Sequence, residues 1–349
     1  MKQAIKRLIL HIARALGLFA LARRLTADRL RILGYHGGSL RDEHVFSPGT
    51  FMTRATFAGR LQFLVDRGYP VLSLDDALEK LEGGTLPANA TVITIDDGWY
   101  GTLVHMVPEL EARGFPATLY MSTYYMEKGT QVFNMYLAYL LSRPAEGLLD
   151  LSSLGSDLSG HYDLGTPYER RAALTVLRDH GESRRTAEQR QDLLRRLSEV
   201  LGIDWQEAEA ARLFTYMTPA EVASLPERGI ALELHTHRHP EIRQGSEIIT
   251  REIEDNRAAL GRVVAGPFTH YCYPSGFHDP SHYPYLAEAG IKSATTTDAG
   301  LVRRNSHRYV LPRILDSQEL SLIEFEAEMC GFLDLLRGAR GGTRSLSGS

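Results

Sequence analysis

Thr91-Val-Ile-Thr-Ile-Asp-Asp-Gly-Trp99 is the stretch that decides the fold. Its apolar side chains, from Val92 to Ile95, fall on both faces of a strand, which is typical of a parallel sheet covered on both sides. Two adjacent carboxylates, Asp96 and Asp97, follow where the strand ends, and α/β folds bind their ligands at the carboxyl ends of strands. Burying two neighbouring carboxylates is costly unless a cation or a proton lies between them. The stretch therefore predicts a strand that leads into a functional site, with a solvated Asp-Asp-Gly turn as the alternative.

Apolar runs on either side of this stretch alternate between strand and helix patterns. The predicted strands are 30–36, 71–74, the apolar part of 91–99, 117–121, 230–234, 268–273, 293–297 and 309–315. Helix-starting signals lie between them: Thr218-Pro-Ala-Glu221 has the pattern of a capping box with Pro at the first helical position, and Asp75-Asp76 is predicted to cap a short helix. Because parallel strands are joined by right-handed crossovers, seven or eight such strands indicate an α/β fold, a complete or incomplete (β/α) barrel.

Residues 127–215 interrupt this alternation with a Leu/Ser/Gly-rich loop and charged helical runs. They are predicted to form a helical insertion between two parts of the barrel, 29–126 and 216–325. Residues 326–349 are expected to end a helix and continue into a Gly/Ser/Arg-rich disordered tail.

The composition excludes several function classes. The chain has 349 residues and a formal net charge of -4, whereas a nucleic-acid binder would normally show a basic excess over the whole domain. Cys272 and Cys330 are the only cysteines, so neither a disulfide framework nor a Cys-x-x-Cys metal site is indicated.

Residues 1–28 differ from the rest because Lys and Arg alternate with large aliphatic side chains. They are predicted to form one cationic amphipathic helix, too short and too interrupted to span a bilayer. Two interpretations stay open: the helix lies on an anionic membrane surface, or it packs its apolar stripe on the main domain. Ala20-Leu21-Ala22 only weakly imitates a signal-peptide cleavage site, so a cytoplasmic protein, peripheral at the inner membrane, is expected in preference to an exported one.

A histidine cluster, His235-Thr-His-Arg-His-Pro240, directly follows the predicted strand 230–234. Its imidazoles should reach the same edge of the sheet as the two aspartates. In a helical turn, His235 and His239 share one face and His237 points away, whereas in a continued strand all three share a face. Pro240 favours the turn, so His235 and His239 are the predicted ligands.

Two imidazoles and a carboxylate suit zinc, with Co²⁺, Ni²⁺ or Fe²⁺ as alternatives, and they leave open positions for water. A bound metal lowers the pKa of its water and polarises a carbonyl, while a second carboxylate can take the water's proton. We therefore expect Asp97 to bind the metal and Asp96 to remain free as the base.

These motifs resemble those of the polysaccharide deacetylases, also called NodB-homology or carbohydrate esterase family 4 enzymes. Thr94-Ile-Asp-Asp-Gly98 is similar to the family's Thr-Phe-Asp-Asp-Gly motif, whose first Asp is the base and whose second Asp is a metal ligand. His235–Pro240 is similar to the family's His-Ser/Thr-x-x-His-Pro motif, whose outer histidines complete the metal triad. The resemblance spans about 31–315, with the helical insertion added. It implies a distorted or incomplete (β/α) barrel of the NodB-homology type.

Later motifs depart from the family's commonest pattern, since Cys272 and Arg313 stand where an Arg and a His are usual. The segments 271–276 and 311–314 instead resemble the branch associated with exopolysaccharide and cell-surface glycans. Arg313 cannot give up a proton near neutrality, so it is expected to orient Asp96 or to stabilise an oxyanion. The general acid stays open among His36, His237, His278 and a metal-bound water.

The resemblance implies a metal-dependent hydrolase that removes acetyl groups from an N-acetylated amino sugar in a polysaccharide or a lipid-linked glycan. The residues expected to contact this carbohydrate are His36, Trp99, Tyr273, Pro274 and Gly276. The alternatives are a carbohydrate O-deacetylase, a weakened glycan-binding pseudoenzyme, and a hydrolase of cyclic amides or imides. The intact metal triad counts against the last of these.

Overall fold

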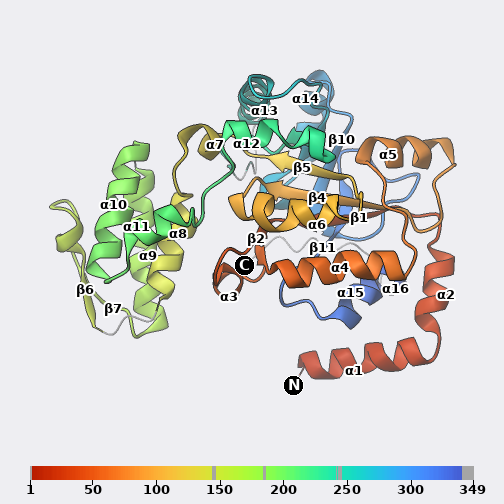
Figure 1. Cartoon of the computed structure of the whole chain (residues 1–349), viewed down its shortest axis with the longest axis horizontal. Coiled ribbons are helices and arrows are strands. Elements are labelled where there is room, and N and C mark those ends of the chain that lie inside the picture. Colours follow the sequence, from red (N-terminus) through yellow and green to blue (C-terminus); the bar gives the residue numbers. More distant parts are fainter. Residues whose placement is uncertain (1, 144–146, 184–185, 241, 243–245, 340–349) are drawn as a thin grey trace.

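Seven parallel strands form a closed barrel at the centre of the molecule (Figure 1). The computed structural model describes residues 2–143, 147–183, 186–240, 242 and 246–339. Around the barrel the strand order is β1-β11-β10-β9-β8-β5-β4. The barrel strands are β1 (Arg31–Tyr35), β4 (Thr91–Asp97), β5 (Ala117–Met121), β8 (Ile230–Leu234), β9 (His270–Cys272), β10 (Ser293–Ala299) and β11 (Leu311–Leu315). The predicted (β/α) barrel is confirmed.

Strand β4 is buried along its whole length, as its β-branched sequence predicts. It pairs with β1 on one side, where Gly34 lies opposite Thr94, and with β5 on the other, where Asp96 lies opposite Tyr120. Because all the strands run in the same direction, Asp96 and Asp97 end β4 at the same rim that receives the loops after β8 and β9.

Helices cover the outside of the barrel (Figure 1). They are α4 (Arg54–Asp66), α5 (Leu74–Gly83), α6 (Val107–Glu111), α12 (Pro219–Ala223), α13 (Ser246–Gly261), α14 (Tyr283–Glu288) and α15 (Leu322–Met329). The short elements α3 (Glu43–Phe46), α7 (Tyr124–Lys128), β2 (Gly37–Gly38) and β3 (Phe51–Met52) belong to loops that follow the strands. The predicted capping box is present at α12, where the Thr218 side chain accepts from the Glu221 amide and the Glu221 side chain accepts from the Thr218 amide.

The predicted strand 71–74 and the cap at Asp75-Asp76 are wrong. Val71 makes only an isolated bridge to Thr91. The Ser73 side chain accepts from the Asp76 amide and caps α5, which begins at Leu74. The capping serine therefore draws the last apolar residue of the run into a helix. The barrel has seven strands, the lower of the two predicted numbers.

The segment between the two parts of the barrel contains helices that lie beside the barrel, on the left in Figure 1. Its elements are α8 (Phe133–Ser142), β6 (Leu148–Asp150), β7 (His161–Asp163), α9 (Pro167–Glu182), α10 (Ala187–Val200) and α11 (Trp205–Ala210). A bridge of Gln131 with Thr215 joins the two ends of this segment to each other, and a bridge of Trp99 with Tyr216 joins the residue that follows it to the carboxyl-end rim of the barrel.

The N-terminal segment forms two helices, α1 (Lys2–Ala15) and α2 (Leu18–Leu25), instead of the single helix predicted. Gly17 separates them with a φ of 78°, a left-handed conformation that glycine adopts without strain. The two helices pack against α15 and α16 (Phe332–Ala339). Among the described residues, no helix has the length and apolar character needed to cross a membrane. Most of the predicted disordered tail, 340–349, lies outside the described residues.

Candidate metal centre

The predicted metal ligands, Asp96 and Arg313 meet in one cavity of about 390 Å³ at the carboxyl-end rim of the barrel. Asp96 and Asp97 reach it from β4, His235 and His239 from the loop after β8, and Arg313 from β11. The residues that line the cavity are His36, Thr50, Asp96, Asp97, Trp99, Tyr125, Val132, Asn134, Met135, Tyr216, His235, Arg238, His239, Tyr273, Ser275, Thr297 and Arg313.

Three donor atoms in this cavity point at one place. The Nε2 atoms of His235 and His239 are 3.2 Å apart, and they lie 3.4 and 3.3 Å from Oδ1 of Asp97. Donors that share one tetrahedral zinc ion at 2.0–2.2 Å are about 3.3–3.6 Å from one another. The spacing and the nitrogen and oxygen donors therefore fit a divalent ion such as zinc.

Neighbouring groups fix which atoms of the ligands face the ion. The indole Nε1 of Trp99 donates to Oδ2 of Asp97 at 2.7 Å, which leaves Oδ1 for a cation. The Nδ1 of His235 donates to the carbonyl of Cys272 at 2.8 Å, which leaves a lone pair on Nε2. Such outer contacts orient metal ligands and raise their basicity. Trp99 and Cys272 therefore support the triad without belonging to it.

The backbone at the site is held in conformations that non-glycine residues rarely adopt. The φ angles of Asp97, Thr236 and His239 are 74°, 66° and 57°. Each such residue costs on the order of 1–3 kcal/mol, and strain of this kind clusters at functional sites. Gly98, with a φ of 101°, is required for space as well, because a Cβ there would lie 2.1 Å from Sδ of Met121. The turn after β8 brings His235 and His239 together, as the turn alternative predicted.

Asp96 is buried and forms a two-pronged ion pair with the buried Arg313, with both N–O distances at 2.8 Å. Burial raises the pKa of Asp96, but the charge and hydrogen bonds of Arg313 outweigh burial, so the net pKa lies below its usual value. The guanidinium is held in turn by the carbonyl of Thr296 at 2.9 Å. Arg313 therefore holds the carboxylate of Asp96 in one orientation.

The pKa shifts of two of the three triad ligands, Asp97 and His239, favour cation binding. Burial raises the pKa of Asp97, but His235 and His239 lower it to a net value well below its usual range. Burial lowers the pKa of His239, which keeps this imidazole neutral, the form that binds metals. Burial lowers the pKa of His235 as well, but Cys272 and Asp97 raise it to a net value above its usual range. A cation bound here would displace that proton.

Of the three candidate acidic imidazoles, His36 alone lines the cavity. Its Nε2 lies 3.8 Å from Oδ2 of Asp96, and its side chain is 27% exposed. His237 points away, with its Nδ1 2.8 Å from the hydroxyl of Thr123. His278 lines a separate cavity.

Of the residues expected to contact carbohydrate, some line the cavity and others do not. Trp99, Tyr273 and His36 line the cavity, whereas Pro274 and Gly276 are not among its lining residues, and Ser275 between them is. Sequence reasoning missed the lining residues that come from the helical insertion, Val132, Asn134 and Met135. No motif or spacing marks these three, because only the way the insertion folds back over the rim brings them to the site.

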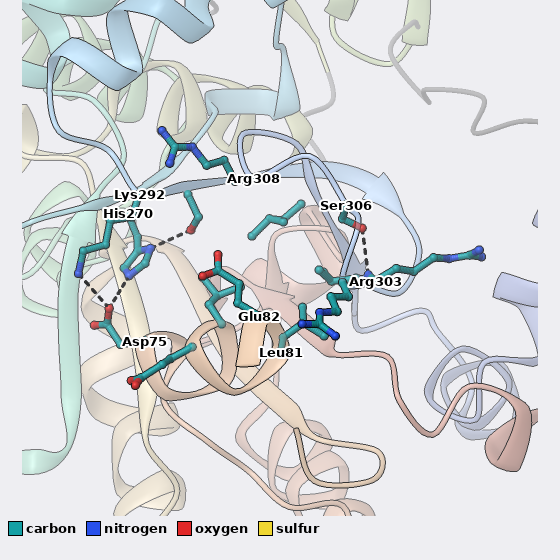
Figure 2. Close-up of a pocket in the computed structure, with 14 residues that line it drawn as sticks. Asp75, Leu81, Glu82, His270, Lys292, Arg303, Ser306 and Arg308 are labelled. Carbon is teal, nitrogen blue, oxygen red and sulfur yellow. Dashed lines mark hydrogen bonds and ion pairs between the residues drawn. The ribbon is translucent and has the colours of Figure 1, made fainter. Parts of the chain in front are cut away.

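A second cavity, of about 430 Å³, lies at the amino ends of the barrel strands (Figure 2). Here Nε2 of His270 lies 3.0 Å from Oδ1 of Asp75, and its Nδ1 lies 2.8 Å from the hydroxyl of Ser293. His270 and Ser293 begin β9 and β10, so this network is at the opposite end of the barrel from the triad. None of the predicted site residues lines this second cavity.

Comparisons with known proteins agree with the barrel and the motifs. Residues 184–294, which contain His235 and His239, match the family model described as polysaccharide deacetylase. No curated protein sequence matches the chain. The Streptococcus pyogenes deacetylase PplD, solved in complex with acetate, has a TM-score of 0.58 and 18% identity, covering 86% of this chain and 98% of its own.

Two further solved structures share the fold. IcaB from Ammonifex degensii has a TM-score of 0.55 and 16% identity, covering 87% of this chain and 97% of its own. A de-N-acetylase from Aggregatibacter actinomycetemcomitans has a TM-score of 0.53 and 13% identity, covering 86% of this chain and 99% of its own. Residues 184–294 are therefore similar in sequence to polysaccharide deacetylases, and the closed barrel is the fold of these solved deacetylases.

Proposed function

We propose that the protein is a metal-dependent deacetylase that hydrolyses the acetamide of an N-acetylated amino sugar in a polysaccharide or a lipid-linked glycan. The observation that carries this proposal is the convergence of Asp97, His235 and His239 beside an ionised Asp96 in one cavity. A carboxylate that is free of the triad but next to it is the arrangement that metal-assisted hydrolysis requires.

A divalent ion held by Asp97, His235 and His239 would polarise the acetyl carbonyl and lower the pKa of a water molecule. Asp96 takes the proton of the attacking water, and Arg313 holds the carboxylate in position for this transfer. The same ion pair lowers the basicity of Asp96. It also fixes the orientation of the carboxylate and keeps it ionised at neutral pH.

We assign the general acid to His36. When the bond between the acetyl carbon and the sugar nitrogen breaks, the amine needs a proton, and Arg313 cannot supply one. The position of His36 in the cavity, near Asp96, allows it to donate this proton. Acetate then carries the oxygen of the water, and the sugar is left with a free amine.

The cavity walls suit a neutral sugar ring. Trp99, Tyr125, Tyr216 and Tyr273 contribute aromatic surface, and Asn134 adds an amide that can donate and accept hydrogen bonds. Two structural neighbours support the reaction type, since one is named a de-N-acetylase and the other was solved with acetate.

The test is to incubate the zinc-loaded protein with oligomers of N-acetylglucosamine and to measure acetate and free amine together. We expect equal amounts of both, and release slower by about 10² to 10⁴ from Asp96→Asn. Acetate from an O-acetylated sugar without amine from the oligomer would identify an O-deacetylase instead. Binding to the oligomer without acetate from either substrate would favour the glycan-binding alternative.

A further inference from the structure

Most of the large aliphatic side chains of the N-terminal helices point into solvent. Their exposed fractions range from 39% to 71%. On α1 they are Ile5, Leu8, Ile9 and Ile12, and on α2 they are Leu18, Leu21 and Leu25, with Leu16 between the helices. Within each helix the spacing of three and four residues puts them on one side. We call these eight residues the N-terminal apolar face.

The opposite side of the same helices is firmly docked. Leu10, Ala13 and Phe19 are buried against α15 and α16, and Ala22 is buried as well. Ion pairs tie the charged side chains of α1 to α15, with Lys6 Nζ 2.9 Å and Arg7 Nε 3.2 Å from the carboxylate of Glu324. An ordinary surface helix buries its large aliphatic side and exposes its charges. Here several cations are used for docking, and the large aliphatic side chains are left in water.

The region around the N-terminal apolar face is cationic. Residues 2–29 contain seven of the chain's 39 Lys and Arg but one of its 43 Asp and Glu, so they carry +6 while the remainder carries -10. Between these helices and α4 is a cleft of about 280 Å³ lined by Arg14, Arg23 and Arg67 together with Glu326. Glu326 pairs with both Arg14 and Arg67, so the cleft keeps an excess of positive charge.

We propose that the N-terminal apolar face docks the protein on the surface of a bilayer that contains anionic phospholipids. The aliphatic side chains would enter the interface, the exposed Arg24 would meet the phosphates, and the positive charge of the whole segment would attract the anionic surface. A second copy of the chain fits the surface less well, because a symmetric pairing of this face would bring two +6 segments together.

The test uses sedimentation of the full chain with vesicles of phosphatidylglycerol and phosphatidylcholine. Wild type should bind these vesicles, bind pure phosphatidylcholine more weakly, and lose affinity as salt is raised. The double variant Leu8→Ser, Ile12→Ser should bind the vesicles more weakly by roughly tenfold or more, since burying one large aliphatic side chain raises affinity by a factor on the order of ten. Arg24→Glu should weaken it several-fold at low salt and little at high salt.

The matched control is the pair Leu148→Ser and Val200→Ser, which removes exposed aliphatic side chains from the helical insertion and should leave vesicle binding unchanged. Acetate release from a soluble oligomer should be the same in all these variants, which separates this proposal from the assigned chemistry. Equal vesicle binding by wild type and the Leu8/Ile12 variant would overturn the proposal. A dimer in vesicle-free buffer that the same variant dissociates would overturn it in favour of a second copy.

Discussion

Asp96 and Asp97 are neighbours in sequence, but their surroundings differ. Oδ1 of Asp97 faces two imidazole nitrogens, whereas both oxygens of Asp96 face Arg313. Asp96→Asn should therefore keep the metal and lower the rate by about 10² to 10⁴, the usual contribution of a general base. Asp97→Asn should lower metal affinity, and excess metal should restore part of the rate. Metal content and acetate release, measured on the same samples, check both expectations.

Asp96→Asn also leaves the buried Arg313 without its counter-charge, which costs on the order of 3–5 kcal/mol in a buried pair. The rate must therefore be expressed per folded protein, measured by circular dichroism. Metal loss in Asp96→Asn together with metal retention in Asp97→Asn would reverse the two roles.

His36 and His237 provide a matched pair for the assignment of the general acid. His36→Gln should retain the metal and slow acetate release by about 10² to 10⁴, because the leaving amine loses its proton donor. His237→Gln should change neither quantity by more than a few-fold, since His237 contacts Thr123 outside the cavity. Equal rates in both variants, measured with the metal bound, would remove His36 from the mechanism.

At the scale of elements, α1 depends on an ionised carboxylate on α15. Burial raises the pKa of Glu324, but hydrogen bonds from Ser321 and Lys6 lower it to about 2, below the ordinary value of 4.5. A carboxylate whose pKa is lowered on folding stabilises the folded protein at pH values above its ordinary pKa, and this stabilisation is lost as pH falls toward 2. Glu324→Gln should therefore lower the melting temperature at pH 7 and have a smaller effect at pH 3.

Differential scanning calorimetry of wild type and Glu324→Gln at both pH values measures this difference. Glu227→Gln, at an exposed position elsewhere on the chain, should have no effect at either pH. The same loss of stability from Glu324→Gln at pH 7 and pH 3 would show that the ion pairs do not hold α1.

Elements with strong local signals could be predicted from the sequence. The buried run of β4 and the capping box of α12 depend on neighbouring residues alone. The predictions of a strand at 71–74 and of a single N-terminal helix were wrong because one residue in each segment, Ser73 and Gly17, changes the course of the backbone. Local patterns also could not say which side of α1 packs, since that depends on Glu324, more than 300 residues away.

At the scale of the whole molecule, the barrel determines how much of the site a sequence can reveal. The triad was predictable because parallel strands bring all their carboxyl ends to one rim. The hydrogen bond from His235 to the Cys272 carbonyl could not be predicted, and neither could the places of Asn134 and Met135 in the cavity. These contacts depend on the backbone and on how the insertion folds, and neither leaves a pattern in the sequence.

Metal binding should stabilise the entire fold, since the ligands come from separate strands and the unfolded chain holds no formed site. Zinc at about 100 times its Kd should add roughly 2.7 kcal/mol to the free energy of unfolding. Thermal unfolding with and without zinc should therefore show a rise of several degrees in wild type and none in His239→Ala. An equal rise in both would place the stabilising ion elsewhere.

If Asp97, His235 and His239 hold an ion that deacetylation needs, acetate release must depend on that ion, and measuring release before and after metal removal checks this. Protein stripped with a chelator should release no acetate from N-acetylglucosamine oligomers, and one equivalent of zinc per chain should restore the rate. Stripped protein that keeps its full rate, with its metal content verified as zero, would contradict the account.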